Sequence, residues 1–269
     1  MRYPALQPVQ YQLSLQSVSK HFQTRQGKLH VLNGVDLDVR KGEFLCLLGP
    51  SGCGKSTLFN IIAGLEPPDS GELLVEGEPV SGPGPDRVVV FQDGALFPWL
   101  TALGNVEFGL SMLNIPAAER RERAMDALEM VRLARFADAY IHELSGGMRQ
   151  RVAIARAVAM QPKVLLMDEP FAALDAQTRN VMHEELQRIW AKTGKTIIFV
   201  THNVAEAIRL GDRVAVLSFR PGSIKREVVI SHPRPRKADD PRLLEIRMFL
   251  VRDLKADVQA AVEEELCDG

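Results

Sequence analysis

The stretch FLCLLGPSGCGKSTLFNIIAG, residues 44–64, decides the fold of this 269-residue chain. Its apolar beginning predicts a buried strand over Phe44 to Leu48, and KSTLFNIIAG predicts a helix that starts at Lys55 and ends at Gly64. Between them, GPSGCGKST matches the pattern G-x-x-x-x-G-K-[ST], whose backbone N–H groups surround phosphates. A strand, a glycine-rich loop and a helix in this order are the context that the pattern requires. We therefore predict a phosphate-binding loop rather than a plain glycine-rich turn.

Each position of this loop has an expected role in binding a nucleotide. Lys55 is expected to bridge the β and γ phosphates, and Ser56 is expected to offer its hydroxyl to Mg²⁺. The candidate contacts are Gly49, Pro50, Ser51, Gly52, Cys53, Gly54, Lys55, Ser56 and Thr57. Cys53 is predicted to be reactive and protected by ATP, because a helix N-terminus and Lys55 should lower the pKa of its thiol. Simple loop filling and redox sensing are the other roles considered for Cys53.

The rest of the chain alternates between strand and helix patterns. Residues 12–76 are mostly short period-two segments, apart from the helix after the loop, and RVVVF ends at Phe91. A helical texture then continues to about Met160. KVLLM, TIIFV and RVAVLSF follow as strands, with a helical stretch at 176–192. This pattern predicts an α/β fold with a mostly parallel sheet, an N-terminal antiparallel β subdomain and a helical insert.

The overall composition is that of an average globular protein. Lys and Arg number 33 against 34 Asp and Glu, so no excess of positive charge suggests nucleic acid as a partner. The three cysteines show no paired spacing, which argues against a disulfide framework or a zinc site and favours a reducing, cytosolic compartment. MRYPALQPVQ at the start has no apolar run, and no segment approaches the roughly 18 apolar residues of a membrane span. We expect any work at a membrane to be done from its side.

VLLMDEP, residues 164–170, is a predicted buried strand that ends in two acids. Asp168 can hold the water shell of a metal ion, and Glu169 can polarise an attacking water molecule. Two acids after a strand are a common pattern, so the signal is weak alone. It becomes strong with a phosphate-binding loop upstream.

LSGGMRQRVAIARA, residues 144–157, opens a second helix with a serine and two glycines. Such a helix N-terminus presents free N–H groups and a positive dipole end to an anion. The chain therefore contains two candidate anion-binding helix starts, although one nucleotide needs only one phosphate-binding loop.

Over residues 13–236 the chain resembles the nucleotide-binding subunit of an ATP-binding cassette (ABC) transporter, and LSGGMRQR resembles the family signature LSGGQ. Beyond the loop, the acids and the signature, the resemblance assigns a role to each of four further residues. These are Gln92 in the Q-loop, as a metal and nucleotide contact; Asp175 of ALDA in the D-loop; His202 of THN as the switch histidine; and Phe22 of SKHF, stacking on adenine. Alone, Gln92 would be an exposed loop residue, His202 a capping or core histidine, and Phe22 a core residue with His21 as the stacking ring.

The sequence departs from the family pattern at two positions. Met148 stands where the family often has Gln, which puts in doubt any polar contact of that side chain. Ala172, in the stretch AALDA, replaces the commoner serine and cannot supply a hydroxyl. Neither departure touches the acids Asp168 and Glu169.

The resemblance also implies partners and cofactors. Two cassettes would pair head to tail, so that Ser145, Gly146 and Gly147 of one chain serve the ATP of the other, with Mg²⁺ at each site. A membrane permease would dock on the helical insert, a separate solute-binding protein would complete the importer, and the chain would lie peripherally on the cytoplasmic face of a bacterial inner membrane. FQDGALFPWLTALGNVEFGL, LSFRPGSI and HPRPR look like the ATPases of nitrate, sulfonate and taurine importers. Trp99 could serve docking or be a core aromatic of the insert.

The expected domain plan has an ABC ATPase domain over residues 12–236 and a helical extension over 237–269. Residues 12–92 and 161–236 form its catalytic core, and residues 93–160 form the helical signature subdomain. The segments 81–86 and 232–241 are expected to be loops or linkers. The extension spaces Leu244, Met248, Val251, Val258 and Val262 at helical intervals, a stripe that we expect to pack on its own domain rather than bind a partner.

Three other functions would fit parts of the sequence. A P-loop kinase for a small molecule would need a substrate pocket in place of the signature helix. A translation or repair ATPase of the ABC type would need a second cassette or a long coiled coil. A cassette without hydrolysis would be expected to lose Glu169 or His202, and both are present.

Overall fold

The computed structural model describes residues 11–25, 27–237 and 240–267, with side chains up to residue 263 at the C-terminal end. The opening stretch MRYPALQPVQ and the side chain of Cys267 therefore lie outside the described part. No helix within these ranges is both long and apolar enough to cross a bilayer.

A six-stranded sheet forms the centre of the molecule. Five of its strands are parallel, and the edge strand β10 is antiparallel to β9. In spatial order the strands are β10 (Ile224–Val229), β9 (Arg213–Leu217), β3 (Phe44–Leu48), β8 (Thr196–Thr201), β7 (Val164–Asp168) and β6 (Arg87–Val90). The predicted mostly parallel sheet is confirmed. The charged edge strand β10, IKREVV, was missing from the sequence prediction.

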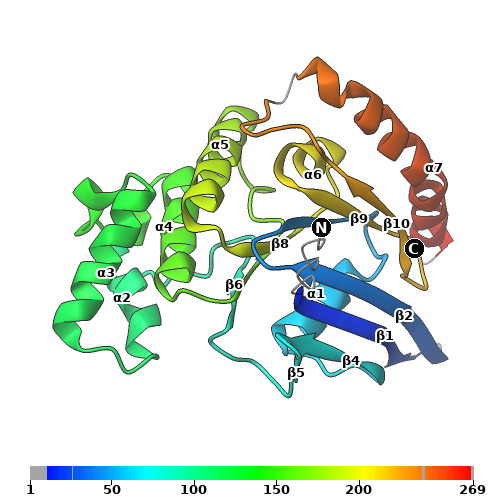
Figure 1. Cartoon of the computed structure of the whole chain (residues 1–269), viewed down its shortest axis with the longest axis horizontal. Coiled ribbons are helices and arrows are strands. Elements are labelled where there is room, and N and C mark those ends of the chain that lie inside the picture. Colours follow the sequence, from blue (N-terminus) through cyan, green and yellow to red (C-terminus); the bar gives the residue numbers. More distant parts are fainter. Residues whose placement is uncertain (1–10, 26, 238–239, 268–269) are drawn as a thin grey trace, which may run out of the picture.

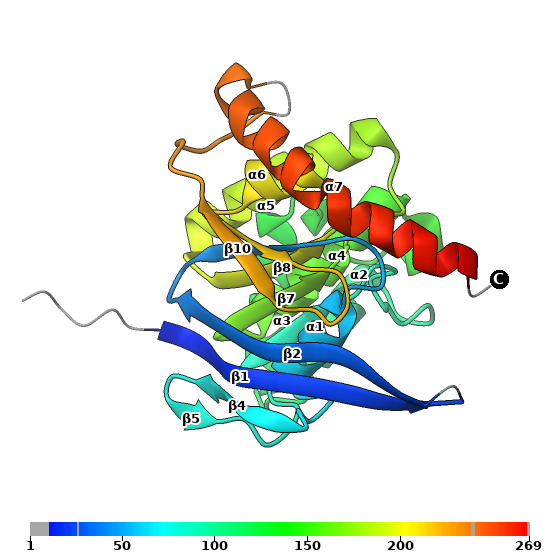
Figure 2. The ribbon, with the colours of Figure 1, turned by 90° about the vertical axis from the view of Figure 1, so that its right-hand side faces the viewer.

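A second, antiparallel sheet lies beside the first, as Figure 2 shows. It confirms the predicted N-terminal β subdomain. Its order is β2 (Gly27–Arg40), β1 (Tyr11–Thr24), β4 (Ser70–Val75) and β5 (Glu78–Pro79). The helix α1 (Lys55–Ala63) packs in the same hydrophobic cluster as residues of both sheets. It ends at Gly64, whose φ of 77° is left-handed, as expected for a C-terminal glycine.

The helical insert stands to one side of the two sheets (Figure 1). It contains α2 (Ala102–Ser111), α3 (Ala117–Met130), two short 3₁₀ turns (Ala134–Phe136 and Ile141–Glu143) and α4 (Gly146–Ala159). The remaining helices are α5 (Ala176–Thr193), α6 (Val204–Leu210) and α7 (Leu244–Cys267), with a 3₁₀ turn (Pro241–Leu243) before α7.

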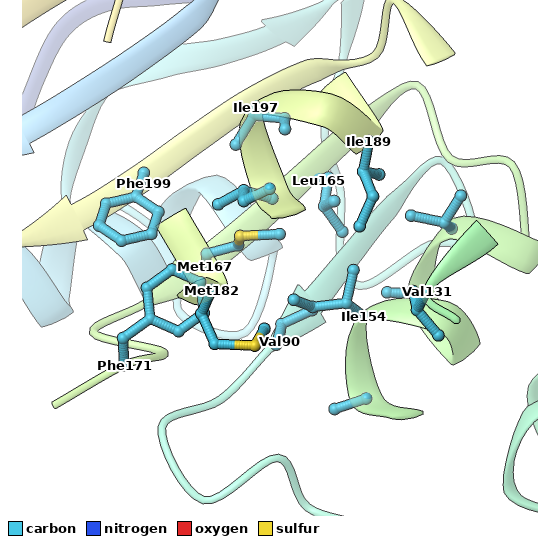
Figure 3. Packing of buried hydrophobic residues seen from close by; sticks show 14 of the residues in the cluster. Val90, Val131, Ile154, Leu165, Met167, Phe171, Met182, Ile189, Ile197 and Phe199 are labelled. Atoms are coloured by element: carbon cyan, nitrogen blue, oxygen red, sulfur yellow. The ribbon is translucent and has the colours of Figure 1, made fainter. Parts of the chain in front are cut away.

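Alternation along the central strands divides the core into two clusters. In β7, Leu165 and Met167 belong to the cluster that contains side chains of α4 and α5, whereas Val164 and Leu166 belong to the cluster that contains side chains of α1. Figure 3 shows the first cluster, where Met167 and Phe199 from the sheet lie near Met182 from α5. Both faces of the central strands are therefore buried, as in parallel sheets covered on both sides.

The C-terminal helix packs on its own domain as predicted, but the apolar stripe predicted to make this contact is on the exposed face of the helix. α7 packs on its own domain through another set, which includes the buried Leu250 and Leu254. The five predicted residues, Leu244, Met248, Val251, Val258 and Val262, are each about half exposed. Two stripes with helical spacing exist on this helix, and spacing alone does not tell which one faces the sheet. Figure 2 shows α7 on the outside of the molecule.

The segment HPRPR, expected to be a linker, is anchored by its arginines. Arg236 is only 1 % exposed and donates to the carbonyl oxygens of Ile208 and Gly211, among others. Arg234 pairs with Asp212, and its guanidinium lies 4.2 Å from the ring centre of Trp190. A guanidinium carries five donors, so it can be buried where several carbonyls converge. Arg236 is therefore part of the core, and Arg234 is fixed at its edge.

Candidate nucleotide site

The carboxyl ends of the parallel strands bring the predicted site residues to one edge of the central sheet. This edge is where open α/β sheets bind ligands. The loop Gly49–Thr57 follows β3, Gln92 follows β6, Glu169 follows β7, and His202 follows β8. The register sets Leu48 beside Thr201 and Asp168 beside Val200, so neighbouring strands end at similar levels.

The loop Gly49–Thr57, called the P-loop below, is shaped for close approach by an anion. Gly52 and Gly54 have φ of 74° and 98°, values that side chains other than glycine rarely adopt. The helix α1 has no side-chain cap and no acid in its first turn, which leaves its first N–H groups for a ligand. Ser51 and Ser56 are exposed at this opening.

Lys55 supplies a cation inside the P-loop. Its side chain is 7 % exposed, and Nζ donates to the carbonyl oxygens of Gly49 and Pro50 at 2.8 and 2.6 Å. An uncapped helix start, left-handed glycines and a buried ammonium together fit the triphosphate of ATP.

The expectation that the helix N-terminus and Lys55 lower the pKa of the Cys53 thiol is wrong. Its side chain is fully buried, and the sulfur lies 4.0 Å from Lys55 Nζ. Burial raises the pKa of the Cys53 thiol above its ordinary value, and the positive charge of Lys55 opposes this only in part. A Cβ on Gly49 would lie 2.7 Å from the sulfur, so the cysteine fills space that glycine leaves open. Loop filling, the alternative role, describes its place in the structure.

Glu169 and His202 form a direct pair at the ends of β7 and β8. The distance from His202 Nδ1 to Glu169 Oε1 is 2.9 Å. Glu169 has a left-handed backbone with φ of 42°, and its N–H donates to Val200 O at 3.1 Å. The His202 side chain is 57 % exposed, so it is not a core histidine. The carboxylate and the imidazole are both accessible from the sheet edge.

Asp168 is the last residue of β7, at the sheet edge that also carries the P-loop. Its partial burial and the adjacent charge of Glu169 raise the pKa of its carboxyl, while Lys55 opposes the rise. Among the described residues, no group of three or more His, Cys, Asp or Glu could hold a metal ion by itself. Mg²⁺ usually takes one or two protein ligands together with phosphates and water. Ser56 and Asp168 are an oxygen set of this kind, and Gln92 is exposed beyond β6.

The signature stretch begins α4 as predicted. Ser145 caps the helix by accepting from the Met148 N–H at 3.3 Å, and Gly147 is buried beside Thr178 of α5. Met148, the first departure from the family pattern, packs against the main hydrophobic cluster. Ala172, the second departure, is exposed.

Asp175 acts as the N-cap of α5, where its carboxylate accepts from the N–H groups of Gln177 and Thr178, both at 3.0 Å. The side-chain hydrogen bond from Thr178, together with the N–H groups of Thr178 and Gln177, keeps the pKa of the Asp175 carboxyl below its usual value.

Phe22 lies on β1 with 37 % of its surface exposed. The competing ring, His21, is already held: its N–H and Nδ1 both contact Asp69, and it stacks on His30 with ring centres 4.1 Å apart. Of the two candidates for an adenine contact, Phe22 is the more exposed ring, with Lys20 Nζ 5.4 Å from its centre.

Sequence reasoning missed a buried polar network behind the Glu169 and His202 pair. Glu206 of α6 contacts His183 Nε2 at 3.2 Å and accepts from the hydroxyl of Thr201, the residue before His202. Burial opposes ionisation of Glu206, but these two hydrogen bonds leave its pKa lowered. Arg179, which lies 4.0 Å from Glu206, donates to the carbonyl of Leu174 beside Asp175. The network thus links the segment before Asp175 to the residue before His202; the helical spacing of Arg179 and His183 on α5 was the signal in the sequence.

The fold and this sheet edge define a P-loop ATPase with a helical insert that carries its own glycine-led helix. Residues 32–172 match the model of the ABC transporter family, just over half of the chain. Together with the relatives below, this match shows that the chain belongs to the ABC transporter family, as one of its ATP-binding ATPases.

Three curated relatives align along most of their length. The chain is 51 % identical to an uncharacterised ABC transporter ATP-binding protein of Methanocaldococcus jannaschii over 91 % of this chain and 92 % of the relative. It is 47 % identical to the nitrate import ATP-binding protein NrtD of Synechocystis, over 87 % and 88 %. It is 46 % identical to the taurine import ATP-binding protein TauB of Burkholderia pseudomallei, over 92 % and 98 %.

One solved relative is a dimer in a post-hydrolysis state, an ATP-binding cassette bound to ADP and phosphate. It superposes with a TM-score of 0.71 at 36 % identity, covering 82 % of this chain and all of the solved chain. The resemblance stated from the sequence is confirmed at the level of the family.

Proposed function

We propose that this chain is the ATP-hydrolysing subunit of an importer for a small anion of the nitrate, sulfonate and taurine type. The observation that carries hydrolysis is the contact between Glu169 and His202 at the sheet edge that also holds the P-loop. Support for the import role comes from relatives named for nitrate and taurine import at 47 % and 46 % identity. The chain would act peripherally at the cytoplasmic face of a bacterial inner membrane.

The residues divide the work at this site. Backbone N–H groups of the P-loop and Lys55 would bind the phosphates, and Phe22 would pack on adenine. Ser56 and Gln92 would hold Mg²⁺ and Asp168 its water shell, and the ion would neutralise phosphate charge. Glu169 positions and deprotonates the attacking water. His202, in contact with Glu169, orients that carboxylate and responds to the γ-phosphate.

The second anion-binding helix start belongs, in this proposal, to the site of another copy. Ser145, Gly146 and Gly147 would face the ATP held by the partner chain, with Asp175 nearby. The proposal is supported by the dimeric form of the solved cassette with ADP and phosphate. ATP then joins the two chains, and hydrolysis lets them separate.

A permease would dock on an aromatic patch of the helical insert. Trp99, Phe108 and Met112 are 70, 41 and 62 % exposed, so Trp99 is not a core residue. Phe97 joins the patch to the interior: its ring centre is 5.4 Å from that of Trp99 and 4.4 Å from that of Phe108. An exposed apolar patch of this kind marks a partner surface.

Arg156 connects this patch to the signature helix. From α4 it donates to the carbonyl oxygens of Gly94 and Ala95, just after Gln92, at 2.9 and 2.8 Å, and lies 5.8 Å from the Phe97 ring centre. A permease that pushes on Trp99 would therefore move the Q-loop and α4 together.

The proposed domain division keeps residues 12–236 as the ATPase domain and 237–269 as the extension. Arg236, the last residue of the former, is buried against carbonyls of the core. The helical signature subdomain is kept at residues 93–160.

Growth of a deletion strain tests the function. Cells that lack this chain should fail to use nitrate, a sulfonate or taurine at low concentration, and the wild-type chain, but not Glu169→Gln, should restore growth. A separate solute-binding protein would confer the choice of anion. Restoration by Glu169→Gln, or phosphate transfer from ATP to a small molecule in place of hydrolysis, would overturn the proposal in favour of an adaptor or a P-loop kinase.

A further inference from the structure

The loop between β9 and β10, residues 218–223, lies against the outer side of the P-loop. Arg220 Nε donates to the carbonyl oxygen of Gly52 at 2.9 Å. Gly222 sits so close to the next peptide that a Cβ there would lie 2.3 Å from Cys53 O. The backbone N–H of Gly222 donates to Val31 O at 2.8 Å, which fixes the loop to β2. Arg220 and Gly222 therefore lie against the carbonyl groups of Gly52 and Cys53 in the P-loop, not against its N–H groups.

These contacts fix the direction of the N–H groups of Cys53 and Gly54. In a trans peptide the C=O and the following N–H point in opposite directions. Arg220 holds the Gly52 carbonyl toward the outside, so the Cys53 N–H of the same peptide points to the opposite side. The same reasoning applies to the Cys53 carbonyl, beside Gly222, and to the Gly54 N–H. N–H groups of this loop are the ones that the motif turns toward phosphates.

The C-terminal helix α7 holds the 218–223 loop in turn. Asp257 Oδ1 accepts from the Phe219 N–H at 2.9 Å, and its Oδ2 pairs with Lys225 Nζ at 2.8 Å. Lys225 also donates to Asp253 O at 2.7 Å. A continuous set of contacts therefore runs from α7 through residues 218–223 to the P-loop, over residues that are distant in sequence.

We propose that Arg220 is a positioning residue for ATP binding, which keeps the Cys53 N–H directed at the phosphates, and that Asp257 of α7 holds the loop of Arg220 in place. The C-terminal helix is then a control point for nucleotide affinity: a shift of α7 weakens the grip of the P-loop without touching Glu169 or His202. The inference rests on the proposed placement of the phosphates in the P-loop.

Nucleotide affinity and turnover of point variants test this assignment. Arg220→Met should raise the Kd and KM for ATP about tenfold, the loss expected for a charge-assisted hydrogen bond, with kcat at saturating ATP nearly unchanged. Arg220→Lys should recover part of the affinity, because an ammonium can donate to the same carbonyl. Asp257→Ala should raise the Kd roughly threefold, since it removes the hydrogen bond by which the Phe219 N–H holds the loop to α7. Combined with Arg220→Met, it should add little, because both act through the Gly52 peptide.

Two further variants separate the possible failures. Arg226→Met is the matched control: Arg226 is on the same hairpin, and its ion pair with Asp253 and its contact with the Phe249 ring are both made to α7. Equal losses of affinity in Arg226→Met and Arg220→Met would show a general weakening of the hairpin and overturn the inference. If Lys55→Ala weakens ATP binding but Arg220→Met leaves the Kd unchanged, this inference is wrong while the placement of the phosphates stands. Asp257→Ala takes the place of Arg220→Met in this comparison if Arg220→Met does not fold. If Lys55→Ala leaves the Kd unchanged, the placement of the phosphates fails first.

Discussion

The chain begins two helices with glycine-rich turns, and the two turns are built differently. The turn before α1 contains a buried ammonium, two left-handed glycines and no side-chain cap. The turn before α4 differs: its own Ser145 caps the helix, and its cation is the exposed Arg149, which donates to the carbonyl of Leu144 at 2.7 Å. The first turn carries what is needed to bind phosphates within one chain. The second turn has no buried ammonium and no left-handed glycine, and its cation, Arg149, is exposed, which is why we propose that it completes a site in another copy.

Removing the carboxylate beside the P-loop should have the largest effect. We expect Glu169→Gln to lower kcat about 1,000-fold, because the attacking water loses its general base. ATP binding should be retained, since the phosphates contact other residues, and the ATP-joined dimer should persist. Steady-state hydrolysis and sedimentation with Mg-ATP measure both. A monomeric, fully active variant would contradict the proposed division of roles.

A charge change in the first turn should affect the ATP bound by the same chain, and one in the second turn should affect the ATP bound by the partner chain. Lys55→Ala should weaken ATP binding by roughly 10- to 100-fold, as for the loss of a charged hydrogen-bond donor. Ser145→Arg should leave ATP binding by the monomer intact but abolish dimerisation and hydrolysis, because a long cation would stand where the partner's nucleotide approaches.

Mixing the two variants measures whether the signature acts on the partner. A mixed dimer has one site with both defects and one site with an intact Lys55 and an intact Ser145, so part of the activity should return. If the mixture is no more active than its components, each signature serves its own chain. The difference between the two turns would then need another explanation.

The adjacent glycines of the second turn should respond differently to the same methyl group. A Cβ on Gly147 would lie 2.6 Å from Thr178 Cγ2, whereas one on Gly146 would meet Leu174 at an ordinary 3.5 Å. Gly147→Ala should destabilise the fold by about 1–3 kcal/mol, and Thr178→Ser, which removes that methyl, should restore stability. Gly146→Ala should keep its stability but lose ATPase activity if this turn meets the partner's ATP. Thermal unfolding and hydrolysis rates separate the two effects, and an unstable Gly146→Ala variant would contradict them.

The parts of the fold that the sequence predicts well are those set by local pattern. The strand β3, the P-loop and α1 follow from neighbouring residues, and parallel strands then bring Asp168, Glu169 and His202 to one edge. The roles of these residues stay predictions, but their meeting place follows from topology.

What the sequence did not predict depends on contacts between distant segments. The buried face of α7 was missed because two apolar stripes have helical spacing, and only packing against the sheet selects one. Arg236 was read as part of a linker because the stretch 232–241 is rich in proline and charged residues; its five donors meet converging carbonyl groups instead, which buries it. The loop 218–223 reaches the P-loop from well over a hundred residues away, and no local pattern announces such a contact.

The smallest expected effect is on the reaction rate of the Cys53 thiol, which reports how closely the P-loop is packed. Its thiol is buried and its pKa is raised, so less thiolate is present near pH 7.5 than in an ordinary cysteine, and reaction with iodoacetamide should be slow. The rate should keep rising as the pH passes the ordinary thiol pKa of about 8.5, and saturating Mg-ATP should change it little. Ser51→Cys, combined with Cys53→Ser, is the matched probe, because Ser51 is exposed on the same loop. With Cys267→Ser in both proteins to remove the third thiol, the new cysteine should react fast and be protected by ATP. Equal rates at positions 51 and 53 would show that the P-loop opens in solution and that the burial of Cys53 does not persist there.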